Sequence, residues 1–189
     1  MLRQPLLLLL ALAAAGCDRS GLPEEEPEEM APGTFVARVE QVGGGGFEEL
    51  QGTAVVDVEP TVKVRLAVPI ADGASRVDLL VEGPRPDDAA LPGPGVYRIG
   101  DATVEDPAAA LCYRSPVFAD GPYRSESGSL TVTGVSAETL DAEFEAVGAL
   151  DLATGPDTSV RVRVELSGRF RARPGQVGDS AGSIRRCDP

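Results

Sequence analysis

The sequence predicts an all-β domain, either an antiparallel β-sandwich or a partly closed β-barrel of about nine strands, after a signal peptide and a disordered acidic tether. Apolar and polar residues alternate with a period of two over most of the domain, which is typical of strands with one buried and one wet face. Glycine and proline mark nearly every junction between these runs, and no long segment has the helical period of 3.6. Short strands at this spacing favour a sandwich or a barrel.

Residues 1–16 are predicted to be a signal peptide. Arg3 provides a short basic start, and residues 6–15 form an unbroken apolar run. At a helical rise of about 1.5 Å per residue, this run reaches only about half of a ~30 Å hydrocarbon core. It is therefore too short to span a membrane and is typical of a signal-peptide core.

The residues that follow, Ala14-Ala15-Gly16-Cys17, resemble the lipobox of bacterial lipoproteins, although Leu is usual where Ala14 stands. The resemblance implies cleavage before Cys17 and acylation of the new N-terminal cysteine, with palmitate as a typical chain. Two or more acyl chains anchor a protein stably to a membrane. We therefore expect a lipid-anchored protein of the cell envelope, on the outer membrane or on the periplasmic face of the inner membrane. The alternative is an ordinary signal peptide followed by a chance cysteine.

Residues 17–33 begin with the cysteine expected to be lipidated and are then rich in glutamate and proline. Like charges repel one another and proline is excluded from helix interiors, so this segment is expected to be an extended tether. Its reach is at most about 50 Å. It either holds the domain off a lipid surface or is simply a solvated linker.

Residues 34–173 are expected to form the β-domain, and a glycine-rich tail, 174–189, follows. Strands are expected at 34–42, 53–58, 62–68, 76–82, 95–99, 109–113, 129–133, 140–146 and 160–172. The clearest alternation places Val160, Val162, Val164, Leu166 and Phe170 in the core. Arginines dominate the wet face of this last strand and acids that of 140–146, so the two would form cross-strand ion pairs if they are neighbours.

The cysteines support export from the cytoplasm. With Cys17 used for acylation, Cys112 and Cys187 remain as a pair in a chain that a signal peptide sends to an oxidising compartment. A disulfide between them would stabilise the fold by about 4 kcal/mol and would tie the tail to the domain. Two free thiols are the alternative.

The order of the segments 95–100, 123–133, 140–146 and 164–172 is similar to that in an uncharacterised group of small bacterial lipoproteins, common among Bacteroidota, in which a lipobox precedes one β-rich domain. The similarity covers about residues 33–173, and its motifs are strand and turn motifs. The resemblance therefore implies a fold and a lipid anchor but no ligand, activity or site residue.

Composition excludes several functions. A net charge of −13 repels phosphate backbones, so we expect no nucleic-acid partner, and the absence of histidine excludes histidine-based catalysis and histidine-ligated metals. Gly178-Asp179-Ser180-Ala181-Gly182 fits the pattern G-x-S-x-G, but Ser180 has no histidine to act as its base, and Lys63 is the only lysine. We interpret this match as chance.

Paired carboxylates are the remaining enzymatic option, because glycoside hydrolysis needs only two acids. The acids in expected loops are Asp87, Asp88, Asp101, Glu105, Asp106, Asp151 and Asp157. The chain has only eight aromatic residues and no tryptophan on which sugars could stack. Loop aspartates also suit calcium, but the spacing D-x-[DN]-x-[DN]-G does not occur. We expect neither a metal nor a cofactor.

One turn-rich stretch is a candidate contact surface. It contains Tyr113, Arg114, Phe118, Tyr123 and Arg124, residue types that are enriched at binding hot spots. Core packing under a loop explains the same residues. The sequence thus favours a non-catalytic structural or binding module that contacts an envelope protein or another ligand, and the alternative is a carboxylate-dependent envelope hydrolase acting on glycans.

Overall fold

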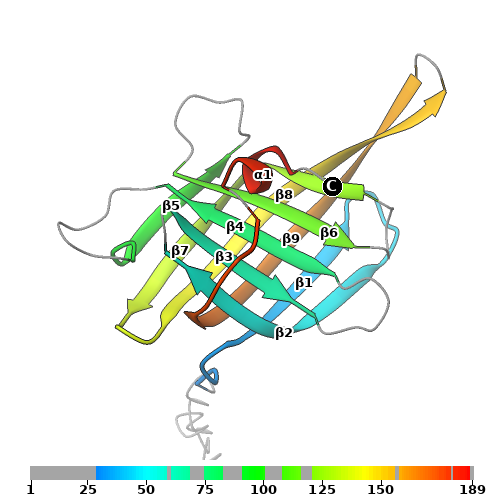
Figure 1. The fold of residues 1–189 in the computed structure, drawn as a ribbon. Coiled ribbons are helices and arrows are strands. Elements are labelled where there is room, and N and C mark those ends of the chain that lie inside the picture. The colour runs from blue at the N-terminus through cyan, green and yellow to red at the C-terminus, as the bar shows by residue number, and fades with distance from the viewer. Residues whose placement is uncertain are drawn as a thin grey trace, which may run out of the picture.

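Nine strands close into a ring in the computed structural model (Figure 1). The structure describes residues 29–58, 61–68, 75–82, 91–100, 108–115, 121–155, 158–179 and 181–187. The elements are β1 (Thr34–Gln41), β2 (Phe47–Asp57), β3 (Val62–Ala67), β4 (Arg76–Val81), β5 (Gly95–Gly100), β6 (Ala109–Ser115), β7 (Gly121–Val135), β8 (Leu140–Gly155), β9 (Thr158–Pro174) and α1 (Ala181–Arg186). The all-β fold is confirmed, and each expected strand overlaps one of these nine. Over the described residues, no helix is long and apolar enough to cross a membrane.

The ring is closed but uneven. Neighbouring strands follow the order β1-β2-β3-β4-β6-β5-β7-β8-β9, and β9 pairs with β1. Most pairs are antiparallel, but β5 contacts β6 through a parallel pairing at Ile99 and Ala109, while β6 also pairs directly with β7. A second parallel contact joins the end of β2 to the end of β9. The sheet is therefore mixed, and it surrounds one main core.

Inward-facing residues of every strand fill that core. On β1, Phe35 and Val39 are completely buried, and Val36, Arg38 and Glu40 between and after them are exposed, as the period of two predicts. The rings of Phe144 on β8 and Phe170 on β9 lie 6.4 Å apart in the same interior. The main core thus depends on alternation in strands that lie far apart in the sequence.

The expected ion pairs between the last two long strands are confirmed because β8 and β9 are neighbours. Asp141 and Arg171 are direct cross-strand partners joined at 2.7 Å, and Asp151 and Arg161 are partners joined at 3.1 Å. The Asp151–Arg161 pair is exposed and the Asp141–Arg171 pair is partly buried. Exposed pairs contribute only about 0–1 kcal/mol each, so the outer pair supports the register more than the stability.

Beyond the ring, β8 and β9 continue as a two-stranded hairpin, drawn in yellow and orange in Figure 1. The pairing of β7 with β8 ends at Ala149, and that of β1 with β9 ends at Val164. Val164, Leu166 and Phe170 are buried as expected, but Val160 is 53% exposed and Val162 is only partly buried. The assignment of Val160 to the core is wrong, because alternation continues past the point where neighbouring strands provide a packing surface.

The C-terminal tail covers the outer face of β4 and β6. Val177 and Ile184 of the tail pack on Leu80 of β4 and Ala110 of β6, and the four side chains form a second, small apolar cluster. Five consecutive residues of β4 are consequently buried, so this strand has two buried faces. The tail also contains the helix α1, where the sequence predicted only a glycine-rich segment.

A buried charge network holds the same tail. Asp78 on β4 is 0% exposed and accepts hydrogen bonds from Arg65 at 2.7 Å and Arg114 at 3.0 Å, while Arg76 lies 3.1 Å away. Asp179 of the tail pairs with both Arg65 and Arg76. A buried carboxylate is costly unless it is paired and hydrogen-bonded, so these arginines allow Asp78 to lie under the tail.

A second polar clamp secures the start of the tail. The Lys63 ammonium lies 2.8 Å from the Asp57 carboxylate and donates to the Val177 carbonyl. The Val177 amide donates back to Asp57 at 3.1 Å. The only lysine of the chain therefore serves tail docking.

Cys112 and Cys187 form the disulfide that the sequence predicted. Their Cα atoms lie 5.3 Å apart and 75 residues separate them in the chain. Cys112 is the cross-strand partner of Asp78, and Cys187 directly follows α1, so the bridge acts on the segment that the charge network also holds.

We expect reduction of this bridge to lower the free energy of unfolding by about 3–4 kcal/mol, because the bridge restricts a long loop of the unfolded chain. Denaturant titrations with and without dithiothreitol measure the difference. The double variant Cys112→Ala/Cys187→Ala should resemble the reduced protein and should not respond to the reductant. Identical titration curves for the oxidised and reduced wild type would contradict the prediction.

Candidate binding groove

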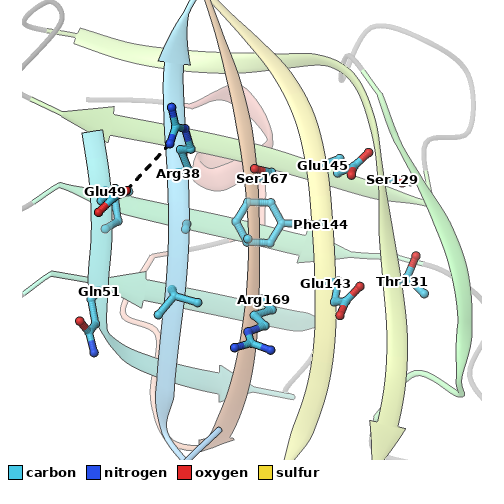
Figure 2. A pocket seen from close by; sticks show the side chains of 14 residues that line it. Arg38, Glu49, Gln51, Ser129, Thr131, Glu143, Phe144, Glu145, Ser167 and Arg169 are labelled. Carbon is cyan, nitrogen blue, oxygen red and sulfur yellow. Dashed lines mark ion pairs between the residues drawn. The ribbon is translucent and has the colours of Figure 1, made fainter. Parts of the chain in front are cut away.

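An open groove lies on the outer face of β2, β1, β9, β8 and β7 (Figure 2). It has a volume of about 810 Å³, and an adjoining hollow of about 470 Å³ shares Arg38, Glu145 and Ser167 with it. Small side chains lie between longer charged ones on this face: Ser167 and Ser129 flank Glu145 across the strands. We call the two hollows together the outer groove.

The strand register aligns the lining side chains in rows across the sheet. The first row is Gln51, Val36, Arg169, Glu143 and Thr131, the second is Glu49, Arg38, Ser167, Glu145 and Ser129, and the third contains Glu40, Glu165, Val147 and Ser127. Neighbouring strands are about 4.8 Å apart, so each row places polar groups at regular intervals. The rows come from both ends of the chain, and pairing of β1 with β9 brings them together.

The floor of the outer groove is closed by Phe144, whose ring lies against β9 at Gly168 (Figure 2). A Cβ atom at position 168 would lie 2.9 Å from the Phe144 ring and 2.7 Å from the Cβ of Ala37, so glycine is required for this close approach. Phe144 is 2% exposed. It therefore supports the floor without offering a face for stacking.

The groove carries an excess of negative charge. Five glutamates and two arginines line it. The Arg38 guanidinium pairs with Glu40, lies 3.9 Å from Glu49 and stands 4.3 Å from the centre of the Phe47 ring.

The other charged residues of the outer groove have no such partner. Glu143, Glu145 and Glu165 are exposed, and none of them takes part in an ion pair within the described ranges. Arg169 is the direct cross-strand partner of Glu143 but is not joined to it by an ion pair either. These four side chains offer charges and hydrogen-bonding groups to a ligand.

The chemistry available in the groove is that of recognition and of carboxylates. Glu143 and Glu145 are two residues apart on β8 and face the same hollow. Ser129, Thr131 and Ser167 add hydroxyl groups, and no described histidine, lysine or cysteine lines the hollow that could activate them. In the part of the chain that the structure describes, no three acidic, histidine or cysteine side chains are grouped so as to hold a metal ion.

The candidate contact residues of the sequence are divided by the structure. Tyr113 and Tyr123 are completely buried with their rings 5.6 Å apart, so core packing accounts for them and they cannot form a contact surface. Arg114 binds Asp78 under the tail, where burial, and then the neighbouring Arg76, lowers its pKa. Arg124 is exposed on β7, and Phe118 lies outside the described residues.

The candidate acids and nucleophile are not brought together in the described residues. Asp151 is exposed on the hairpin and paired with Arg161. The other loop acids, Asp87, Asp88, Asp101, Glu105, Asp106 and Asp157, lie outside the described residues, as do Cys17 and Ser180. Asp179, which precedes Ser180, is bound to arginines of β3 and β4.

Sequence reasoning placed Glu143, Glu145 and Arg169 on wet strand faces but assigned them no site. Alternation showed that they point outward. It gave no indication that β1 and β2 continue the same face beside them, because that pairing joins residues more than 100 positions apart.

A separate polar cluster lies inside the ring, on the inward side of β2. Glu48 accepts hydrogen bonds from the hydroxyls of Tyr113, Ser75 at 2.6 Å and Ser115 at 2.9 Å. These bonds connect β2 to β6 across the interior, because β3 and β4 separate the two strands in the sheet. The cluster therefore braces the ring.

Comparison of the chain with protein-family models, with curated proteins and with solved structures finds no match. The interpretation of the outer groove therefore depends on its own residues and geometry.

We expect none of the three tyrosines to ionise at the ordinary pH of about 10 while the protein stays folded. Burial raises the pKa of Tyr97, Tyr113 and Tyr123, and the hydrogen bond to Glu48 raises that of Tyr113 further. The unfolded chain ionises first, so the stability from these neutral phenols is complete below about pH 10 and is lost as the pH rises above it.

Tyrosinate absorbance during a pH titration measures this effect. In denaturant all three tyrosines should ionise near pH 10, and in the folded protein the absorbance should rise at a higher pH than in denaturant. A tyrosine that ionises near pH 10 before unfolding would contradict its burial.

Proposed function

We propose that this protein is a lipid-anchored, non-catalytic binding module of the bacterial cell envelope. The leader of residues 1–16 and the lipobox-like residues before Cys17 support the anchor. The buried disulfide supports an oxidising compartment such as the periplasm or cell surface. Membership of the lipoprotein group that the sequence resembles is part of the same proposal.

The point where the chain enters the ring from the tether lies close to the outer groove. Glu29, near the start of the described chain, pairs with Arg171 close to the end of β9. The first row of the groove contains Arg169, which is two residues before Arg171 on β9 and so about 7 Å from this entry point. Residues 17–28 would place the entry point at most about 40 Å from the lipid surface.

The single observation that carries the binding function is the outer groove. Binding sites are concave and contain a few convergent polar groups. The outer groove combines exposed carboxylates, a free guanidinium and hydroxyls on rigid strands, so it suits recognition of a polar ligand without further rearrangement.

One observation favours a second candidate, a carboxylate-dependent glycan hydrolase. Glu143 and Glu145 face one hollow, and side chains two residues apart on a strand are about 7 Å apart, a spacing that inverting glycosidases use. Both side chains are exposed, however, and the nearest aromatic ring in the floor, Phe144, is buried. A binding module requires neither a shielded acid nor a sugar platform, so it is the better supported function.

We expect the Cys17→Ser variant to move from the detergent phase to the aqueous phase in Triton X-114 partitioning, because it has no thiol to acylate. The matched variant Ala14→Leu, which introduces the usual lipobox residue, should stay in the detergent phase. If wild type and Cys17→Ser both partition into the aqueous phase, the lipid anchor is excluded.

We expect the protein to release no reducing sugar from a panel of envelope polysaccharides. Binding of a ligand requires no turnover, and the groove lacks a shielded acid. If the wild type releases reducing sugar and the variant Glu143→Gln/Glu145→Gln does not, the protein is a glycan hydrolase and the proposal of a non-catalytic binding module is wrong. Retention of the wild-type circular dichroism by that variant is the control for folding.

A further inference from the structure

The outer groove contains like charges placed directly opposite each other. Glu40 on β1 and Glu165 on β9 are cross-strand partners, and Glu145 is a diagonal neighbour of Glu165 on β8. Like charges in these positions destabilise a sheet. The pairing of Arg38 with Glu40 neutralises only part of this group.

Several acidic side chains elsewhere on the ring are paired with arginines. Asp141 is paired with Arg171, Glu126 lies between Arg161 and Arg163, and Asp78 is held by three arginines. The hydrogen bonds and charges of Arg161 and Arg163 lower the pKa of Glu126 against the opposing effect of burial. Glu143, Glu145 and Glu165 of the outer groove differ from these acids because they face solvent without an arginine partner among the described residues.

Exposed apolar side chains stand near both edges of this face. Phe47, on β2, is the cross-strand partner of Glu40 and is 57% exposed. Val96, on β5, is the partner of Thr131 and is 73% exposed. Isolated apolar residues are common on surfaces, but aromatic residues, phenylalanine included, are enriched at protein interfaces.

The width of the face sets the length of a ligand. Crossing from β2 to β7 involves four interstrand steps of about 4.8 Å, or about 19 Å, which an extended peptide of about six residues spans. A segment that crosses the strands in this way runs along the rows, so cationic side chains at every second position would meet acids on several of the strands, from Glu49 on β2 to Glu145 on β8. Apolar side chains of the same segment could contact Phe47 or Val96.

We propose that the outer groove binds an extended basic polypeptide segment of a partner protein, through Glu143, Glu145 and Glu165. This inference rests on the proposed function, in which the groove is the contact surface. Charge complementarity selects the occupant: the groove has an excess of three negative charges, and its unpaired carboxylates accept hydrogen bonds from lysine or arginine. An acidic segment is repelled, and a glycan finds no exposed ring in the floor.

The test uses the full chain and a fluorescent synthetic peptide of about eight residues that alternates Lys and Ser, long enough to cross the face. Fluorescence anisotropy should show binding that weakens with added salt. The variant Glu143→Gln/Glu145→Gln/Glu165→Gln should bind about tenfold more weakly, the loss that corresponds to three exposed ion pairs of ordinary strength.

The matched control is Glu24→Gln/Glu25→Gln/Glu26→Gln, which changes the net charge equally but lies in the expected tether. It should bind the peptide as the wild type does. Equal weakening by both triple variants would reduce the effect to net charge and would overturn the proposal, as would failure of the wild type to bind.

Two further probes separate this proposal from the proposed function. Suppose that the basic peptide does not bind, but a Glu-Ser peptide or an oligosaccharide does, and the groove variant changes that affinity while the tether variant does not. The groove is then the contact surface and the basic occupant is wrong. If no probe binds at the groove, both are overturned. Unchanged circular dichroism of each variant excludes misfolding as the cause.

Discussion

Docking of the tail on the outer face of β4 and β6 is the constraint on which much of the fold depends. The Cys112–Cys187 bridge, the Asp78 network and the apolar contacts of Ile184 all act there. Without this cover, Asp78 and Leu80 would lie on an exposed face of the sheet. Both side chains are completely buried in the structure, so the tail accounts for their burial. The tail therefore converts part of a one-layer ring into two layers.

This docking divides the ring into two unlike halves. On the half that includes β3, β4 and β6, arginines surround the buried Asp78, and the tail covers the outer face. The half that includes β1, β9, β8 and β7 has no comparable cover among the described residues, and its outer side chains form the groove. Because the disulfide holds the tail on the first half, the tail leaves the outer groove of the second half open to a ligand.

The strands could be predicted from sequence because alternation is a local property, and it placed Val164 inside and Glu143 outside correctly. Alternation does not report where a sheet ends, so Val160 was misassigned. It also fails on β4, whose second face is buried by residues about 100 positions later. Tyr113 and Tyr123 were candidates for a contact surface because composition cannot distinguish an aromatic residue of an interface from one of the core. The outer groove could not be predicted because it depends on the pairing of β1 with β9, which are far apart in the sequence.

The two halves of the ring differ in how their acidic side chains are paired. In the covered half even a fully buried aspartate has arginine partners, so this chain does place arginines beside its acids. On the open half, Glu165 faces Glu40, and Arg169 is not joined to the glutamate opposite it. Departures from local electrostatic preference concentrate at functional sites, where a ligand supplies the missing partner. If the outer groove binds a basic segment as proposed, that ligand would remove the small energetic disadvantage of these unmatched carboxylates.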